Sequence, residues 1–566
     1  MLTRIGIENF KGIKRCEISN LGKVNVFVGR NNSGKSSILD ALCLIRSAFN
    51  PMLFNEPIPE LLLKRKAIER SLYVLRNFWR NYDIKQRIKF SLEFKNGEKL
   101  NIEMLWMDDI NFYMLFEDLS DTLSKIVDGK YFAKIRMNLG GGWSDEFGSF
   151  VGFASKFPQL NYFLSEIVLI DDYLARKLER LEISIFNRIL VPRLDKKVVE
   201  ELNEIYNLES EGLTYIPISP TRQGFRLATL MRDLCLHVDE IGDGAKYATV
   251  ILSLCLLLEN TAFLIEEIES HQHSEAITKL IPKLVEIANM RNVQLFITTH
   301  SIEVLRAFSQ LPEECDVHFF HIENRGGDIN VRHLGRNIDA KLLLDLGVDI
   351  RYLEAYKKFI VVEGDDDIQF FKSLLKRYGR NAEEFGYFVN AGGKDLLKHV
   401  SVALLSTGKE IMVAMDYDKQ SREALIQSLI NTLESRNYKV QRKDNVLEIE
   451  GNPKITLLPM GLYNDERLKQ IGITQFEMED YCLKLVEVDE NLRKWAGMTL
   501  EELIKNAKHS EITKDMNLSK SSSLLKLLAI KKDKAYKDII DYIISNASDK
   551  SLEKVITKEL KEFLLK

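Results

Sequence analysis

The sequence has little proline, no paired cysteines and no excess of charge of one sign. Only 11 of its 566 residues are proline, which disfavours long proline-rich or disordered linkers. None of the six cysteines belongs to a Cys-x-x-Cys pair, so we expect reduced intracellular thiols, neither a disulfide framework nor a zinc knuckle. The formal net charge of −4 excludes a uniformly basic nucleic-acid binder. Any contact with nucleic acid must therefore use a local patch.

Long hydrophobic runs are also missing. The longest, residues 248–258, is too short to span a bilayer and predicts a buried helix. The first five residues lack the apolar core of a signal peptide. Because one hydrophobic core does not serve a chain of 566 residues, we expect two or more domains. These features predict a cytoplasmic protein that makes no membrane contact.

A glycine-rich segment, Gly-Arg-Asn-Asn-Ser-Gly-Lys-Ser at residues 29–36, follows a candidate strand at residues 23–28 and precedes an apolar helix. This order is the context of a phosphate-binding P-loop, whose backbone N–H groups close around phosphates. We expect Lys35 to neutralise the β- and γ-phosphates and Ser36 to hold Mg²⁺. The residues predicted to bind nucleotide here are Gly29, Asn31, Asn32, Ser33, Gly34, Lys35, Ser36 and Ser37.

Two later apolar strands carry the other residues that an ATPase needs. Residues 261–265 end in Glu266, expected to reach Mg²⁺ through water, and Glu267, expected to orient the attacking water. Residues 294–299 end in His300, which can meet the γ-phosphate because open α/β sheets bind ligands at the carboxyl ends of strands. Alone, such a histidine is more often structural. Because His300 follows the P-loop and the acid pair in the sequence, the functional interpretation is favoured.

Gly242, Asp243 and Gly244 precede another apolar helix and form a second candidate anion site. With the first strand at residues 5–11, these features resemble the ABC-type ATPases of the structural-maintenance-of-chromosomes and DNA-repair group. The resemblance implies a dimer of ATPase heads, in which this signature loop of one subunit closes on ATP held by another. The loop departs from the usual Leu-Ser-Gly-Gly form. The acid pair is Glu-Glu where Asp-Glu is usual, so a carboxylate remains at each position.

About residues 50 to 213 separate the P-loop from the rest of the predicted ATPase domain. Residues 88–94 alternate as a strand does, residues 162–187 show a helical pattern, and the triple glycine at residues 140–142 indicates a turn. This stretch holds no catalytic constellation. By resemblance to related ATPases, such an insertion completes the first lobe and can carry a dimerising arm.

The carboxyl-terminal half contains a strand followed by Glu-Gly, a strand followed by Gly-Gly-Lys, and a strand followed by Asp-x-Asp, with helices between. This layout is typical of a parallel α/β domain with its acids at strand ends. Three adjacent carboxylates repel one another unless divalent cations lie between them, and oxygen ligands favour Mg²⁺ or Mn²⁺. The strands are residues 358–362, 388–391 and 410–415, and the acids are Glu363, Asp416 and Asp418.

This pattern resembles a Toprim domain, the metal-binding module of topoisomerases, primases and certain nucleases. We expect the three aspartates at residues 365–367 to cap the next helix and not to bind metal. An ABC-like ATPase followed by Toprim is the plan of the OLD (overcoming lysogenization defect) nucleases, the Gabija-type antiphage enzymes included. That resemblance covers essentially the whole chain, and it implies that Glu477 and Glu479 are second-metal ligands and that Lys520 is the catalytic lysine. A solvated lysine at a helix start is an equally good interpretation of Lys520.

The expected fold class is α/β, with an ABC-type P-loop ATPase head at residues 1–345 that carries an α+β and helical insertion. A Toprim α/β domain with a helical C-terminal region follows at residues 346–566. The expected function is ATP-regulated, two-metal cleavage of DNA, in defence against phage or plasmids. Glu363 can be a metal ligand or the general base, and the sequence leaves both open. An RNA (tRNA) nuclease, or an ATPase scaffold that only binds nucleic acid or a partner, is an alternative.

The expected partners are DNA or RNA, further copies of the chain in a homodimer or higher homo-oligomer through the ATPase heads, and an accessory defence protein. Residues 491–566 hold 16 Lys and Arg against 11 Asp and Glu. A solvated helical face explains this modest excess as well as a nucleic-acid track does. A near-neutral total charge is therefore compatible with a nuclease.

Overall fold

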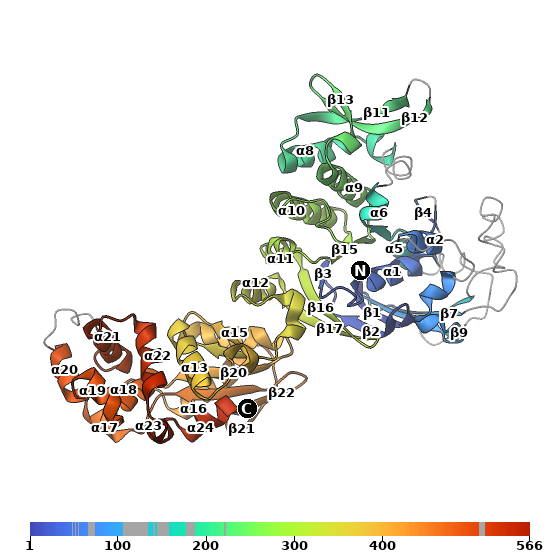
Figure 1. Ribbon diagram of the computed structural model, residues 1–566. Coiled ribbons are helices and arrows are strands. Elements are labelled where there is room, and N and C mark those ends of the chain that lie inside the picture. The colour runs from blue at the N-terminus through green and yellow to red at the C-terminus, as the bar shows by residue number, and fades with distance from the viewer. Residues whose placement is uncertain are drawn as a thin grey trace. The chain divides into compact units, whose positions relative to one another are not determined.

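The computed structural model divides the chain into two compact units, both drawn in Figure 1. The N-terminal unit comprises Met1–Leu344 and Asp349–Tyr352, and the C-terminal unit comprises Asp345–Val348 and Leu353–Lys566. The structure describes residues 1–47, 49–50, 52–54, 56–65, 74–105, 134–139, 142–143, 158–176, 187–219, 222–508 and 516–565.

The described part of the N-terminal unit is built on a twelve-stranded sheet, in the order β10-β14-β15-β3-β16-β17-β2-β1-β6-β7-β8-β9. Strands β10, β14, β15, β3 and β16 are parallel neighbours. All five residues of β3 are buried, as expected for a parallel strand covered on both faces. The strands are β1 (Leu2–Phe10), β2 (Ile13–Ser19), β3 (Val24–Val28), β6 (Ile88–Phe94), β7 (Lys99–Leu105), β8 (Lys134–Leu139), β9 (Gly142–Trp143), β10 (Val168–Ile170), β14 (Ala262–Ile265), β15 (Gln294–Thr298), β16 (Val317–Arg325) and β17 (Asp328–Arg336).

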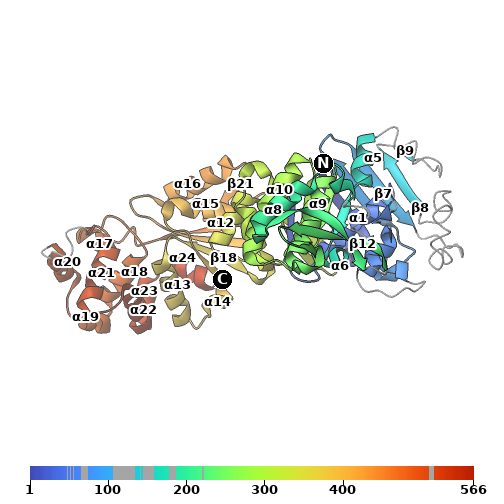
Figure 2. The same ribbon diagram turned by 90° about the horizontal axis from the view of Figure 1, so that it is seen from above.

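Helices α8, α9 and α10 pack against one another and lie side by side in Figures 1 and 2. The apolar run at residues 248–258 lies almost entirely in α9, where its side chains are buried, so the prediction of a buried helix is confirmed. The helices among the described residues of this unit are α1 (Lys35–Arg46), α2 (Ile58–Lys64), η1 (Val74–Phe78), η2 (Arg80–Tyr82), α5 (Pro158–Ser165), α6 (Asp172–Arg176), α8 (Asp195–Tyr206), η4 (Val238–Glu240), α9 (Asp243–Leu257), α10 (Ser274–Met290), α11 (Ile302–Ser309), η5 (Glu313–Cys315) and α12 (Asn337–Asp345), with η6 (Ile350–Ala355) at its end.

Two smaller sheets complete the N-terminal unit. Strands β11 and β12 form a long antiparallel hairpin that β13 joins, and β4 pairs with β5. Strand β6 has the bounds predicted from its alternating pattern and extends the main sheet. Their bounds are β4 (Met52–Leu53), β5 (Glu56–Pro57), β11 (Ser210–Ser219), β12 (Arg222–Met231) and β13 (Cys235–His237).

The helical pattern predicted for residues 162–187 is wrong in part. Helix α5 ends at Ser165, and the buried strand β10 follows before α6. Strand β10 pairs in parallel with β14, and this tertiary pairing overrides the local pattern. Residues 177–186, and Gly140 and Gly141 of the predicted turn, lie outside the described residues.

The C-terminal unit contains a six-stranded sheet in the order β19-β18-β20-β23-β22-β21, whose first four strands are parallel. One hydrophobic core joins this sheet to the helices that follow it, from Ile360 to Leu564. The elements are β18 (Lys358–Val362), α13 (Asp365–Arg377), α14 (Ala382–Phe385), β19 (Tyr387–Asn390), α15 (Lys394–Leu405), β20 (Glu410–Asp416), α16 (Arg422–Ser435), β21 (Val440–Lys443), β22 (Val446–Ile449), β23 (Ile455–Met460), α17 (Glu466–Gln470), α18 (Glu479–Val488), α19 (Glu490–Ala496), α20 (Leu500–Lys508), α21 (Ser521–Lys531), α22 (Tyr536–Asn546), α23 (Asp549–Val555) and α24 (Lys558–Leu565).

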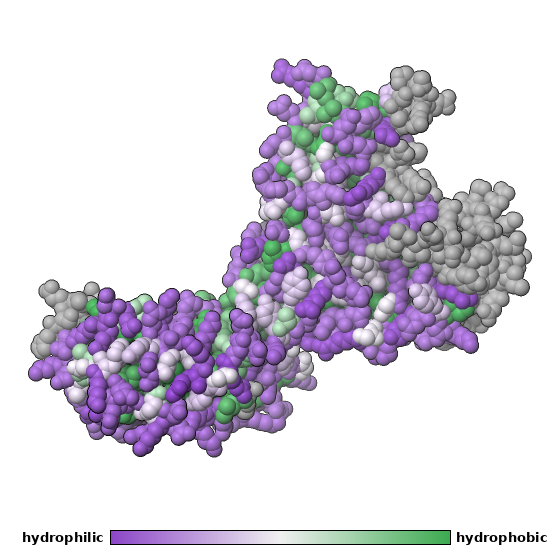
Figure 3. Space-filling view, viewed as in Figure 1, coloured by the Kyte–Doolittle hydropathy of each residue, from purple (hydrophilic) through white to green (hydrophobic). Residues whose placement is uncertain are grey.

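Hydrophilic residues dominate the face of each unit seen in Figure 3, with hydrophobic residues scattered among them. Within the described ranges, no helix combines the length and the apolar character needed to cross a membrane.

Candidate functional site

The glycine-rich segment forms a loop between β3 and α1, at the carboxyl edge of the parallel strands. Gly29 has a φ of 143°, and a Cβ there would lie 2.2 Å from the carbonyl oxygen of Ile322, so only glycine fits. The buried Lys35 ammonium donates to the carbonyl oxygens of Gly29 (2.7 Å) and Arg30 (2.9 Å). A phosphate at the start of α1 would compete for these donors. The geometry is that of a P-loop.

The remaining predicted P-loop residues differ in exposure. Ser33 is buried, Ser36 and Ser37 are half-buried, and Asn31 and Asn32 are exposed. Because the two serines lie in the first turn of α1, their hydroxyls are near the N–H groups that a phosphate would bind.

The acid pair follows β14, and β15 lies between β14 and β3. Glu267 is exposed, with a φ of 52°, and its N–H donates to Thr298 Oγ1 at 3.0 Å. Glu266 is buried and accepts from the Arg65 guanidinium. The two predicted acids therefore have different environments. Glu267 is exposed to solvent, and Glu266 is buried and paired with a cation.

Arg65, directly after α2, is the centre of a buried charge cluster. Its side chain is fully buried and also pairs with Asp40 and Asp171, each at 2.6 Å. Burial lowers the pKa of Arg65, but the three carboxylates raise it by more, so the guanidinium stays charged. Glu266, expected to face nucleotide-bound Mg²⁺, thus faces an internal cation in this structure.

His300 follows β15 and is half-buried. Its backbone N–H donates to Glu269 Oε1 at 2.6 Å. Burial lowers the pKa of His300, and the positive charges of Lys35 and Arg351 lower it further. The imidazole is therefore neutral at neutral pH and lies within electrostatic reach of the P-loop lysine. Its role as a phosphate sensor stays a prediction.

The predicted signature loop begins α9 and is attached to the segment that follows the acid pair. The Gly244 carbonyl accepts from Tyr206 Oη (3.0 Å) and Gln272 Nε2 (2.8 Å). The Asp243 side chain is 72% exposed. The contacts of Gly244 thus connect two predicted ATPase motifs, and nucleotide binding by Gly242, Asp243 and Gly244 stays a prediction.

In the C-terminal unit, the predicted acids gather at the carboxyl edge of the sheet. Strands β18 and β20 are parallel neighbours, and the Asp416 N–H donates to Glu363 Oε1 at 3.2 Å. A β-bridge joins Asp418 to Phe476, and the Met478 N–H donates to Asp416 Oδ1 at 3.0 Å. These backbone contacts bring the later segment, with Glu477 and Glu479, to the acids that follow β18 and β20.

Two lysines contact this acid cluster. Lys394 Nζ lies 2.8 Å from Asp418 Oδ2, and Lys520 Nζ lies 3.3 Å from both Asp418 Oδ1 and Glu477 Oε2. Burial raises the pKa of Asp418, but hydrogen bonds and ion pairs with the two lysines lower it overall. Lys520 is the residue at the start of α21 and its side chain is 32% exposed, so its catalytic role stays a prediction.

Four acids of this region have raised pKa values. Burial, followed by the charges of neighbouring carboxylates, raises the pKa of Asp416 well above its usual range and that of Glu479 to about 8. The pKa of Glu363 is raised, chiefly by burial, and that of Asp367 is raised to about 7. Crowded carboxylates of this kind are stabilised by a divalent cation.

The donor chemistry of this cluster fits a hard metal ion, although the side chains do not converge on one point. Within the described part of the chain, no group of three His, Cys, Asp or Glu residues is placed to hold a metal. One backbone and one side-chain donor engage the carboxylates instead. The Ser522 N–H donates to Glu477 Oε1 (2.6 Å), and the Tyr536 hydroxyl donates to Glu479 Oε1 (2.9 Å). Binding a cation would require these carboxylates to rotate.

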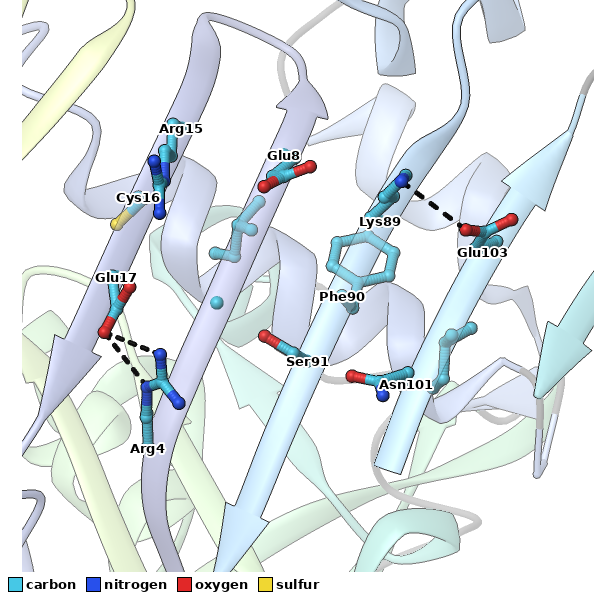
Figure 4. Close-up of a pocket in the computed structure, with 13 residues that line it drawn as sticks. Arg4, Glu8, Arg15, Cys16, Glu17, Lys89, Phe90, Ser91, Asn101 and Glu103 are labelled. Atoms are coloured by element: carbon cyan, nitrogen blue, oxygen red, sulfur yellow. Dashed lines mark hydrogen bonds and ion pairs between the residues drawn. The ribbon is translucent and has the colours of Figure 1, made fainter. Parts of the chain in front are cut away.

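A separate hollow of about 470 Å³ opens on strands β2, β1, β6 and β7 (Figure 4). Oppositely charged residues on adjacent strands compensate one another, which is typical of a solvated sheet face. The charged pairs are Arg4–Glu17, Glu8–Arg15 and Lys89–Glu103.

A P-loop, an acid pair after one parallel strand and a histidine after the next, all at one sheet edge, define a P-loop ATPase domain. Residues 1–137 and 159–305, half of the chain, match the family described as AAA ATPase domain. The chain belongs to this family. Residues 357–564 match a second family, described as a protein of unknown function (DUF3226).

Sequence relatives cover different parts of the chain. An ATP/GTP phosphatase of Helicobacter pylori is 22% identical over 347 residues, which are 56% of this chain and 90% of that protein. An uncharacterized protein of Methanocaldococcus jannaschii is 38% identical over 106 residues, 18% of this chain. The match spans less than half of that relative, 46% of its length.

Matches among solved structures include heads of SMC proteins. An SMC head bound to the C-terminal winged-helix domain of ScpA has a TM-score of 0.37 and 12% identity, covering 59% of this chain and 97% of that one. The SMC head domain from Thermotoga maritima has a TM-score of 0.33 and 12% identity, covering 58% of this chain and 97% of that one.

Several residues of these sites carried no recognisable sequence signal. Arg65 and Asp171 lie in the stretch read as an insertion, outside any motif. Asp367 caps its helix as expected, since its carboxylate accepts the Gly364 N–H at 2.9 Å, yet it also belongs electrostatically to the acid cluster. Lys394 lies in a visible Gly-Gly-Lys pattern after a strand, but the pattern does not predict its contact with Asp418.

Proposed function

We propose that the protein is an ABC-type ATPase coupled to a metal-dependent DNA endonuclease of the Toprim type, as in OLD nucleases. The observation that carries this proposal is that Lys520 contacts Asp418 and Glu477 while Glu363 accepts the Asp416 N–H. These residues come from segments up to 157 positions apart. Gathering acids in the interior lowers the free energy of unfolding, and packing of the domain alone does not require such a cluster. In metal-dependent phosphodiester hydrolysis, such a cluster would have a function.

In the ATPase domain, Lys35 would bind the β- and γ-phosphates and His300 would contact the γ-phosphate as a neutral donor. Glu267, exposed and carried on a strained backbone, would orient the attacking water. Ser36 and Glu266 would hold Mg²⁺. Glu266 would have to exchange its Arg65 partner for that role.

In the C-terminal unit, bound Mg²⁺ or Mn²⁺ would supply charge neutralisation and an activated water. The residues that would hold it are acids of the cluster: Glu363, Asp416, Asp418, Glu477 and Glu479. Lys520 would donate to the developing charge on the phosphate. Lys394 would hold Asp418 in place. Glu363 can act as ligand or as general base.

The decisive experiment measures nicking of supercoiled DNA with Mg²⁺ or Mn²⁺. We expect Asp416→Ala to abolish cleavage and Asp444→Ala, which removes an 82% exposed carboxylate of the same unit, to leave it unchanged. Metal binding by itself is read from the shift in melting temperature that Mn²⁺ causes. Undiminished cleavage by Asp416→Ala would contradict the nuclease proposal.

Labelled RNA is incubated beside the DNA, so that an RNA nuclease is recognised by its product. A gel shift without cleavage of either substrate would support the scaffold alternative. Phosphate release from ATP is measured in parallel, with Lys35→Ala as the inactive variant. A homodimer through the ATPase heads and a role in antiphage or anti-plasmid defence belong to the same proposal.

A further inference from the structure

The segment Asp349–Tyr352 belongs to the N-terminal unit, although residues on both sides of it belong to the C-terminal unit. It opens η6, where Ile350 is fully buried. From Tyr352 the chain continues through five residues to β18, the strand that ends directly before Glu363. This short connection links the segment directly to the strand that precedes a predicted catalytic acid.

Arg351 attaches the segment to the predicted phosphate sensor. Its Nη1 donates to the carbonyl oxygen of His300 at 2.9 Å. Asp349 fixes the guanidinium, with distances of 2.9 Å to Nε and 2.7 Å to Nη2. Because Glu269 accepts the His300 N–H, the backbone of His300 is held on both sides.

Tyr352 attaches the segment to the P-loop itself. The guanidinium carbon of Arg30, the residue after Gly29, lies 5.9 Å from the centre of the Tyr352 ring. The guanidinium of Arg351 lies 5.3 Å from the same ring. Both distances are within cation–π range. The segment thus contacts the two loops that a γ-phosphate would bridge.

We propose that Arg351 is a positioning residue that holds His300 and transmits nucleotide occupancy of the P-loop to β18. A γ-phosphate beside Lys35 and His300 adds negative charge close to Arg351, which contacts His300, and to Arg30, which shares the Tyr352 ring with Arg351. The two arginines are drawn toward it, and the Asp349–Tyr352 segment moves with them. The inference rests on the ATP-binding part of the proposed function and is independent of nuclease activity.

The test is hydrogen–deuterium exchange of the full-length protein, with and without a non-hydrolysable ATP analogue. We expect the nucleotide to change the exchange of residues 350–363 in the wild type. Arg351→Ala should reduce that change about fivefold or more, with a much smaller change in nucleotide affinity. Tyr352→Leu, which removes only the ring, should have a partial effect.

The matched control is Arg336→Ala, which removes a 56% exposed arginine at the opposite edge of the sheet, beside Asp316. It should leave the nucleotide response intact. A wild-type response in both Arg351→Ala and Tyr352→Leu would overturn the proposal, as would unchanged exchange in a wild-type protein that binds nucleotide. Absence of nucleotide binding would contradict the ATPase assignment as well, whereas absence of DNA cleavage would leave this inference standing.

Discussion

At the residue scale, the buried charges of the ATPase domain give the sharpest test. Arg65 neutralises Asp40, Asp171 and Glu266 without access to solvent. Arg65→Gln should destabilise the N-terminal unit by about 3–5 kcal/mol, because it leaves uncompensated carboxylates in the interior. Thermal unfolding followed by circular dichroism measures this loss.

Arg65→Lys is the matched variant, since it keeps the charge and loses part of the hydrogen-bond fork. Its melting temperature should lie between those of the wild type and Arg65→Gln. A melting temperature of Arg65→Gln equal to that of the wild type would show that the cluster rearranges or takes up water. The prediction would then be wrong.

A second residue-scale prediction concerns His333 on β17. Burial, followed by the charges of His318 and Arg336, lowers the pKa of His333 from 6.5 to about 4. Between these values the unfolded chain binds a proton that the folded chain does not, so this contribution to stability is complete above pH 6.5 and falls as the pH drops to 4. The loss at pH 4 should reach about 2–3 kcal/mol.

His333→Gln keeps a polar group beside His318 and removes the titration. Its melting temperature should therefore depend less steeply on pH between 4 and 6.5 than that of the wild type. His399→Gln, at an exposed position, serves as the control and should follow the wild-type profile. Parallel profiles for the wild type and His333→Gln would exclude His333 as the source.

The sequence indicates the site residues that belong to motifs. It does not indicate the residues that reach the sites only through tertiary packing. Lys35, Glu267 and His300 follow strands, and strand ends in a parallel sheet meet at one edge. Arg65 has no such context, and only the packing of α2 brings it to Glu266. The contacts of Lys520 likewise depend on a bridge to Gln475, which no local pattern encodes.

At the element scale, the start of α9 depends on close backbone approach. A Cβ at Gly244 would lie 2.8 Å from the carbonyl oxygen of His271, so Gly244→Ala should separate α9 from the segment that follows the acid pair. We expect the rate of phosphate release from ATP to fall at least about tenfold, because the loops that would position the attacking water shift relative to one another. Nucleotide binding should change little, since the P-loop is intact.

Gly212→Ala is the control, because a Cβ there meets only Leu230 at an ordinary distance of 3.6 Å. It should retain wild-type hydrolysis. Full activity of Gly244→Ala would mean that α9 tolerates the displacement and that its contacts to Gln272 do not matter for hydrolysis.

Element prediction succeeds where one pattern dominates. The alternating residues of β6 and the all-apolar face of α9 have the expected structures, and the C-terminal strands fall where their apolar runs predict. It fails at β10, three residues that look helical locally but complete the parallel sheet beside β14. No local pattern predicts that Ser521 and Ser522, in the first turn of α21, contact Asp480 and Glu477.

At the scale of the whole molecule, the two predicted sites lie in different units of the chain. The N-terminal unit holds the P-loop and its sensors, and the C-terminal unit holds the acid cluster. The proposed ATP-regulated nuclease requires a signal from one unit to the other, and subunit closure on ATP would supply one, by resemblance to ABC-type ATPases. The state of association is therefore the property to measure.

We expect Glu267→Gln to trap the ATP-bound dimer. The substitution removes the carboxylate that would orient the attacking water but keeps the side-chain volume, so bound ATP is not hydrolysed. With ATP and Mg²⁺, light scattering after size exclusion should give twice the mass seen without nucleotide. Adding Lys35→Ala to Glu267→Gln should abolish the increase, because the P-loop lysine no longer holds the phosphates. A mass that does not respond to ATP in Glu267→Gln would contradict nucleotide-driven closure of the heads.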